Sequence, residues 1–145
     1  MNEKKNTYGE LQDLNLKTLI ALSRCTQNVH KREYKTIKEG GLTVSQFAVL
    51  EILFHKGDLK VSEIIDKILS TGGNMTVVID NLVKVNLVKR CVDSKDRRVN
   101  LISITAEGRN LISEIFPKHL ENINEIFSSL TSEEKENLIS LLKKL

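Results

Sequence analysis

The chain has 145 residues, 40% of them hydrophobic, and its 22 basic and 19 acidic side chains leave a net charge of +3. This length is typical of a single domain, 1–145, that can bury its own core. No apolar run is long enough to cross a membrane and no signal peptide is visible, so we expect a cytoplasmic protein that does not bind membranes. Two cysteines and three scattered histidines predict neither a disulfide framework nor a metal site, and we expect no cofactor.

The N-terminal third predicts two helices. Residues 8–38 are almost free of glycine and proline and carry apolar residues at helical intervals, which predicts one long helix. A second helix is expected from a Thr43 or Ser45 cap to His55, and its nearly continuous apolar surface indicates a central position. Residues 58–60 are candidates for a short extra strand.

A helix-turn-helix is predicted next. Residues 61–68 place apolar side chains at i, i+3, i+4 and i+7, and residues 75–82 repeat that spacing. Between the two stripes, residues 70–73 supply hydroxyls and glycines suited to a turn and a helix cap. Two short helices joined in this way are typical of the motif.

The face of the second helix opposite its apolar stripe is small and polar in its N-terminal half. Such a face can enter a major groove closely, where Asn and Thr bond base edges, and the free amides at the helix start favour a phosphate. For this helix alone, an ordinary solvated face is an equally good interpretation. We predict DNA contacts along it by Ser70, Thr71, Gly72, Gly73, Asn74, Thr76, Val77, Asn81 and Lys84.

The residues after this helix predict a β-hairpin with a charged tip, the wing of a winged helix. Residues 87–92 and 99–104 have strand composition, and Asn86 before them suits a left-handed helix end. Positions 84–98 hold six basic side chains against two acidic ones, which concentrates positive charge where DNA would lie. Lys95, Arg97 and Arg98 are expected to reach a minor groove or its phosphates, with Asp96 orienting an arginine.

The C-terminal part predicts a long helix containing Pro117, which should bend it, and a short leucine-rich helix. The apolar stripes of 8–38 and 106–145 exceed what the winged helix-turn-helix of 43–104 can cover, which favours a homodimer. Two-fold symmetry would place two recognition helices about 34 Å apart on a pseudo-palindromic site. The expected interface residues are Leu11, Leu14, Ile126, Leu138, Leu141, Leu142 and Leu145.

Three stretches resemble the MarR family of bacterial transcriptional regulators: STGGNMTVVIDNLVKVNLVKR, the wing DSKDRR with VNLISIT after it, and TAEG at 105–108. The resemblance extends from about residue 10 to the end. It implies a mainly α fold with a small β-hairpin wing, in which N- and C-terminal helices flank the winged helix-turn-helix and form the dimer. Lys95 stands where the family usually has Arg, and Asn86 where Gly is common; Lys keeps the charge and loses the planar fork.

We therefore predict a sequence-specific DNA-binding regulator, a repressor acting as a dimer on double-stranded DNA. The alternative from another class is a winged helix used as a protein-interaction module. DNA affinity that falls steeply with salt would distinguish the two. We do not expect an enzyme, because no catalytic arrangement of side chains is visible.

The resemblance implies two ways of switching such a regulator. One is a small, often aromatic or phenolic, ligand between the dimer helices and the DNA-binding lobe, for which we name His30, Arg32, Tyr34 and Phe47. The other is oxidation of Cys25, which lies several residues beyond the position of the family's sensor thiol and lacks an evident resolving partner. A lone helical cysteine is more often a small buried apolar residue. We therefore favour the ligand and keep redox sensing as the alternative.

Overall fold

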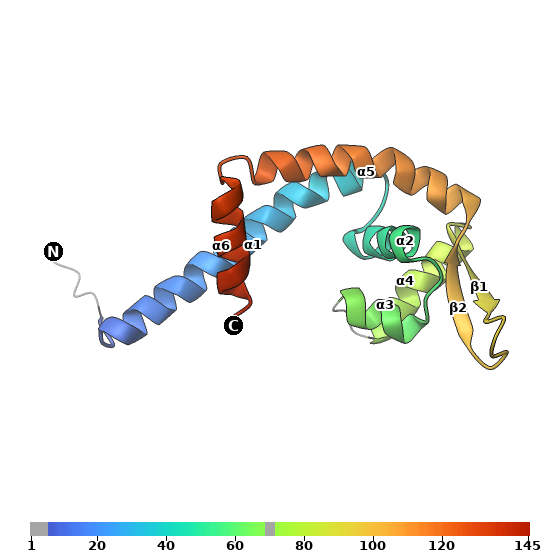
Figure 1. The fold of residues 1–145 in the computed structure, drawn as a ribbon, viewed down its shortest axis with the longest axis horizontal. Helices are drawn as coiled ribbons and strands as arrows, with labels where there is room; N and C mark the ends of the chain where they lie inside the picture. Colours follow the sequence, from blue (N-terminus) through green and yellow to red (C-terminus); the bar gives the residue numbers. More distant parts are fainter. Residues whose placement is uncertain (1–5, 69–71) are drawn as a thin grey trace.

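The computed structural model describes residues 6–68 and 72–145. Within them the chain forms six helices and one antiparallel hairpin, so the predicted mainly α fold with a small wing is confirmed (Figure 1). The elements are α1 (Glu10–Glu39), α2 (Val44–Lys56), α3 (Val61–Ile68), α4 (Gly72–Lys84), β1 (Val88–Val92), β2 (Asn100–Ile104), α5 (Ala106–Ile126) and α6 (Ser132–Leu142). We refer to α2 through β2 as the winged lobe.

Helix α2 lies at the centre of the core, as its apolar sequence predicts. Val49, Leu50 and Leu53 are fully buried, and the helix packs against α1, α3, α4, α5 and β2. Thr43 is the cap: its hydroxyl accepts from the Gln46 amide, and the Gln46 side chain accepts from the Thr43 amide. This capping box satisfies two backbone donors that the first turn leaves free.

The wing is a two-stranded ladder running from the Val88–Ile104 pair to the Val92–Asn100 pair. The extra strand expected at 58–60 is reduced to a single bridge between Leu59 and Ile102, held by two backbone hydrogen bonds. It goes no further because the Lys60 amide bonds the Glu63 carboxylate, which starts α3 at once.

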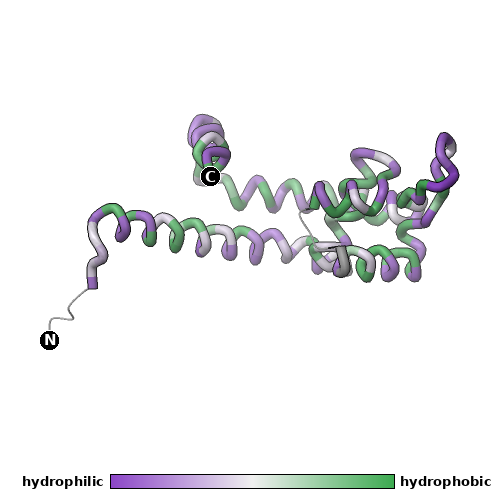
Figure 2. The backbone as a smooth tube through the Cα atoms, turned by 90° about the horizontal axis from the view of Figure 1, so that it is seen from below, coloured by the Kyte–Doolittle hydropathy of each residue, from purple (hydrophilic) through white to green (hydrophobic). Residues whose placement is uncertain are grey.

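Helix α1 is a single helix of 30 residues, about 45 Å long. Its second half runs beside α5, where the Asn122 amide donates to the Arg32 carbonyl at 2.9 Å and to the Thr36 hydroxyl at 3.0 Å. Its first half projects away from the rest of the chain in both views (Figures 1 and 2). There Asp13 accepts from the Thr7 hydroxyl and the Tyr8 amide, and these bonds lower the pKa of its carboxyl.

Helix α5 starts beside the wing and returns along the top of the molecule to α6 (Figure 1). It continues as one helix through Pro117, so the missing backbone donor does not end it. A capping box between Thr131 and Glu134 begins α6, as the sequence predicts.

Candidate DNA-binding interface

Helix α4 divides into a buried and an exposed face, as its periodicity predicts. Met75, Val78, Ile79 and Leu82 are buried against the rest of the winged lobe. Gly72 and Gly73 open the helix, whereas Ser70 and Thr71 lie outside the described residues. The solvent-facing residues of the predicted set are Asn74, Thr76, Val77, Asn81 and Lys84.

This exposed face suits a DNA groove because its N-terminal half carries no long side chain. Asn74 offers an amide that can donate and accept at once, as a bond to an adenine edge requires. The positive end of the helix dipole lies at the same end and favours a phosphate. DNA contacts by these side chains remain a prediction.

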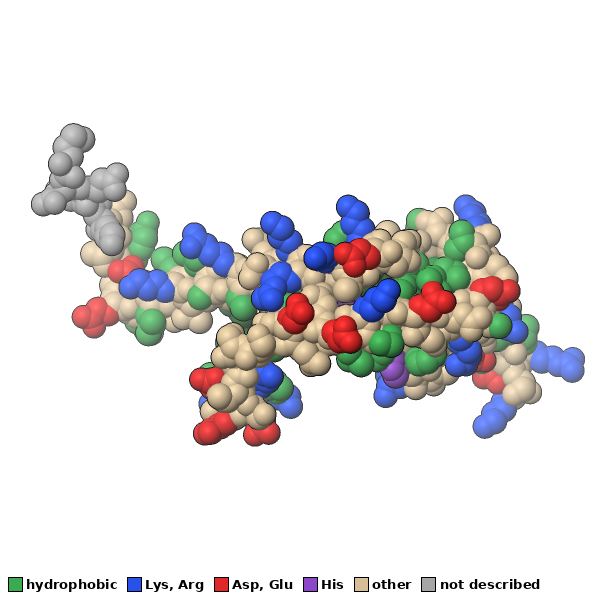
Figure 3. All heavy atoms as spheres, turned by 90° about the horizontal axis from the view of Figure 1, so that it is seen from above, with side chains coloured by type: hydrophobic (Ala, Val, Ile, Leu, Met, Phe, Trp, Pro, Cys, Tyr) green, Lys and Arg blue, Asp and Glu red, His purple; other side chains and the backbone are tan. Residues whose placement is uncertain are grey.

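The tip of the wing is held by short-range hydrogen bonds from its own aspartates. The Asp93 carboxylate accepts from the Lys95 amide at 2.7 Å. Asp96 accepts from the Arg98 amide at 3.0 Å and from the Arg98 Nε at 3.3 Å, which confirms that it orients an arginine. The Arg98 side chain is still 92% exposed. Basic side chains project from the end of the molecule that carries the wing (Figure 3).

An ion pair that sequence reasoning missed connects the recognition helix to the wing. Arg90 on β1 donates to Asp80 on α4 across 2.6 Å, with both side chains about half exposed. Arg90 belongs to the predicted basic patch, and Asp80 neutralises it in this conformation. Asp80 and Arg90 are ten positions apart and lie in different elements, so the periodicity of a single helix or strand does not predict this contact.

The predicted dimer residues lie on exposed stripes, with one exception. Leu11 is 66% exposed and Leu141 59% exposed, and Leu14, Leu138, Leu142 and Leu145 are exposed as well. Ile126 is only 8% exposed because it packs within its own chain, so its assignment to a dimer interface is corrected. Exposed residues that the prediction omitted continue the stripes: Leu16, Leu19, Ile20, Leu22 and Ile139.

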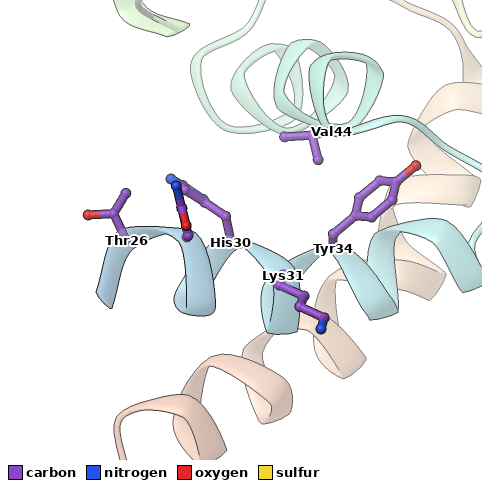
Figure 4. A pocket seen from close by; sticks show the side chains of 6 residues that line it. Thr26, His30, Lys31, Tyr34 and Val44 are labelled. Carbon is purple, nitrogen blue, oxygen red and sulfur yellow. The ribbon is translucent and has the colours of Figure 1, made fainter. Parts of the chain in front are cut away.

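An open pocket of about 460 Å³ lies between α1 and the start of α2, where two of the predicted ligand residues occur. His30 and Tyr34 extend from α1 toward the end of α2 that carries Val44 (Figure 4). Phe47 is not among its lining residues. Its ring is 4% exposed and lies 4.7 Å from the ring of His119, so Phe47 belongs to the core and its place in a pocket is corrected.

Contacts of the Glu33 carboxylate connect this pocket to α5. His30 Nδ1 lies 3.1 Å from one Glu33 oxygen, and the other oxygen lies 3.8 Å from His119 Nε2. His119 is buried and packs on Phe47, so a short chain of contacts runs from the pocket wall to the winged lobe.

The two cysteines differ in exposure. Cys25 is exposed on α1, so its interpretation as a buried apolar residue is wrong. Cys91 is half-buried on β1, with its sulfur 3.2 Å from the Ser103 hydroxyl.

Membrane spans and metal clusters are both absent from residues 6–68 and 72–145. None of the helices there is both long and apolar enough to span a membrane. The same residues contain no group of three or more His, Cys, Asp or Glu side chains that could hold a metal ion.

Comparison with known proteins agrees with this geometry. The family model described as MarR family matches residues 42–99, which cover the winged lobe from α2 to the tip of the wing and stop before β2. The HTH-type transcriptional regulator MhqR of Bacillus subtilis (strain 168) is 39% identical over 135 residues, 93% of each chain.

Two solved structures share the fold. The structure of Bordetella bronchiseptica BpsR, described as regulated in its DNA binding by 6-hydroxynicotinic acid, has a TM-score of 0.77 and 26% identity over 88% of this chain and 97% of its own. A mutant MarR from E. coli complexed with operator DNA has a TM-score of 0.81 at 21% identity, covering 94% of this chain and 98% of its own, and supports the fold alone.

The similarity to MhqR spans almost the whole of both chains, beyond the winged lobe that the family model covers. MhqR is named as an HTH-type transcriptional regulator, which is a class of DNA-binding proteins without a catalytic reaction. The chain is accordingly a DNA-binding transcriptional regulator and not an enzyme, and it belongs to the MarR family.

Proposed function

We propose that this protein is a repressor that binds a pseudo-palindromic operator as a homodimer and leaves it when a small aromatic or phenolic ligand binds. The observation that carries the proposal is the separation of two surfaces. The polar face of α4 and the charged wing lie at one end of the molecule, and the exposed leucines of α1 begin at the other (Figure 1). One surface suits DNA, and the other suits a second copy of the chain.

The DNA surface divides into a part that reads sequence and a part that binds backbone. In a major groove, Asn74, Thr76 and Val77 would meet base edges. The wing would then lie over the flanking minor groove, with Lys95 and Arg97 at phosphates and Arg98 held in place by Asp96. Phosphate contacts of this kind make affinity fall steeply with salt.

The dimer surface is supported by apolar exposure at both ends of the chain. The first half of α1 carries exposed leucines along its length, and α6 adds Leu138, Leu141 and Leu142. Hydrophobic residues recur along the projecting half of α1 in Figure 2. Full burial of one leucine side chain contributes about 1.5–3 kcal/mol, so several of them would stabilise a pair strongly. A two-fold arrangement would present two copies of α4 to successive major grooves.

The ligand proposal rests on the pocket of His30, Tyr34 and Val44 at the junction of α1 and α2. It combines an aromatic ring with an imidazole that already bonds the Glu33 carboxylate and could donate to an acid or phenol instead. The relative BpsR is described as regulated by 6-hydroxynicotinic acid, a hydroxylated aromatic acid. A ligand here would act by binding one dimer geometry more tightly than the other.

Selection from a random DNA pool tests operator binding directly. We expect the selected sequences to contain two inverted half-sites about one helical turn apart and two protected regions in a footprint. Affinity should drop by at least a hundredfold between about 50 and 200 mM salt. Selection of no sequence, together with salt-independent binding, would contradict the proposal and favour a protein-interaction module.

A paired challenge separates the two switching mechanisms. Complexes of the wild type and Cys25→Ser with the selected DNA are treated with 6-hydroxynicotinic and hydroxybenzoic acids or with an organic hydroperoxide. We expect an aromatic acid to release both proteins and peroxide to release neither. Release by peroxide that Cys25→Ser abolishes would establish the redox alternative, and insensitivity to both reagents would exclude a switch by either chemistry tested.

A further inference from the structure

Two connections join the winged lobe to the terminal helices, and they differ in how many contacts constrain them. The first runs from α1 to α2 through Gly41, which has φ of 79°. A Cβ at this position would meet no heavy atom within 4 Å from described residues beyond its two chain neighbours. The second is the step from β2 to α5 at Thr105, whose side chain also contacts Asn86 in the turn that ends α4. The second connection is the more constrained.

Thr105 makes four hydrogen-bond contacts, two of which share its single hydroxyl proton. Its hydroxyl lies 2.7 Å from the Asn86 carbonyl and 3.0 Å from the Leu87 carbonyl, and it accepts from the Gly108 amide at 3.0 Å. The Thr105 amide donates to the same Leu87 carbonyl at 3.1 Å. Asn86 has φ of 57°, a left-handed conformation that turns the chain directly after α4. One side chain thus connects the end of the recognition helix to the start of α5.

The N-cap of α5 differs from those of α2 and α6. At those helices, Gln46 or Glu134 at the third helical position reaches back to the amide of its own capping threonine. At α5 that position is Gly108, and the Leu87 carbonyl binds the capping amide in its place. The first turn of α5 is therefore completed by the turn that ends α4.

Gly108 also permits the close approach on which this joint depends. A Cβ at this position would lie 2.2 Å from the Leu87 carbonyl oxygen and 2.8 Å from an Ile104 side-chain carbon. The Leu87 backbone cannot move aside as a flexible side chain can. Any larger residue at position 108 would therefore push α5 away from the turn that ends α4. A glycine at the third position both removes the capping box and allows the tertiary contact that replaces it.

We propose that Thr105 is a positioning residue that fixes the angle between the recognition helix and α5, and with it the half-site spacing that the dimer accepts. This inference rests on the homodimer proposed above. Helix α5 has 21 residues and a length of about 31 Å. A change of about 10° at Thr105 would shift a recognition helix relative to the dimer helices by about 5 Å, more than the rise of one base pair, about 3.4 Å.

Four variants distinguish the contact of Thr105 with the turn after α4 from its role as a helix cap. Thr105→Ser keeps both the donated and the accepted hydrogen bond. Thr105→Asp keeps a cap for the Gly108 amide and places a carboxylate, which cannot donate, against two carbonyls. Thr105→Val loses both. Thr43→Val is the matched control, because it removes the threonine cap at the start of the winged lobe, whose hydroxyl accepts from the Gln46 backbone amide.

The readout is the ratio of affinities for duplexes whose two half-sites are at the selected spacing or one base pair further apart. Fluorescence anisotropy at fixed salt should show a loss of more than tenfold for wild type, Thr105→Ser and Thr43→Val. For Thr105→Asp and Thr105→Val we expect a loss of less than threefold. This ratio is independent of changes in total affinity or stability that affect both duplexes equally.

The wild-type ratio in Thr105→Asp and Thr105→Val would overturn the inference. So would an equally reduced ratio in Thr43→Val, because the effect would then follow general loss of a helix cap. Failure of the proposed dimer looks different: the wild type itself would bind a single half-site as tightly as the full site, with no spacing preference.

Discussion

The winged lobe and the first half of α1 have similar apolar stripes in sequence, but the stripes are buried in the lobe and exposed on α1. Leu53 in α2 is fully buried, whereas Leu11 and Leu14 in α1 are mostly exposed. The lobe gathers several elements around α2, so each of its stripes meets another within one chain. Among the described residues, the first half of α1 projects away from the other elements (Figure 1), and its leucines stay exposed.

This difference shows that hydrophobic periodicity reports which face of a helix will be covered and not which chain covers it. In the lobe, stability comes from contacts inside one chain. In the terminal helices, part of the apolar surface is left for another molecule, and on our proposal that molecule is a second copy. The following changes act on one region at a time and so test the distinction.

The largest effect is expected from paired alanine substitutions in the two regions. Leu53→Ala should lower the free energy of unfolding by about 2–5 kcal/mol, because it leaves a cavity in the lobe core. Its effect should be the same at every protein concentration. Leu141→Ala should instead weaken association, so its shift in melting temperature should be near zero where both proteins are monomeric and should rise to a plateau as concentration increases. Calorimetry at several concentrations compares them, and equal concentration dependence in both would contradict the distinction.

Truncation after Ser128 removes α6 and its exposed leucines and leaves the winged lobe intact. We expect a monomeric or aggregated protein whose affinity for the full operator falls by about a hundredfold or more, since two half-sites would no longer be bound together. Sedimentation and binding to one half-site measure both consequences. A well-behaved dimer of the shortened chain would show that α6 is peripheral to the interface.

Replacing Arg97 and Arg98 with alanine tests the wing. Affinity should fall by well over tenfold with an unchanged circular-dichroism spectrum, and the slope of affinity against salt should decrease by about 2. Lys143→Ala with Lys144→Ala is the control, because it removes the same charge from the C-terminus, which lies away from the wing (Figure 1). If the two double variants bind low-salt DNA alike, the wing does not contact it.

The smallest change in total affinity is expected from Asn74→Ala on the recognition helix. A side-chain amide that bonds an adenine edge contributes about 1–3 kcal/mol of discrimination, so preference at one base pair in each half-site should relax. Repeating the DNA selection with the variant measures this. A uniform loss of affinity for all sequences would instead assign Asn74 to the DNA backbone.

Local signals in the sequence predicted most of the fold. The threonine caps at 43, 105 and 131, the left-handed Asn86 and the two faces of α4 each depend on residues within one or two turns, and all are observed. The same reasoning placed Asp96 against an arginine, two positions away.

What the sequence did not predict depends on distant contacts. The Asp80–Arg90 ion pair and the bonds from Thr105 to Asn86 cross between elements whose relative placement is unknown until the lobe has folded. Phe47 and Ile126 were assigned to a pocket and an interface because apolar residues serve either purpose, and their burial within the chain decides otherwise.

The mass of the protein on its selected operator tests most directly the claim that a self-sufficient winged lobe is paired through the terminal helices. Native mass spectrometry of the full chain on one duplex should give two chains per DNA, with half-site centres about 34 Å apart in the accompanying footprint. One chain per duplex, bound with the full affinity of the wild type, would contradict the account.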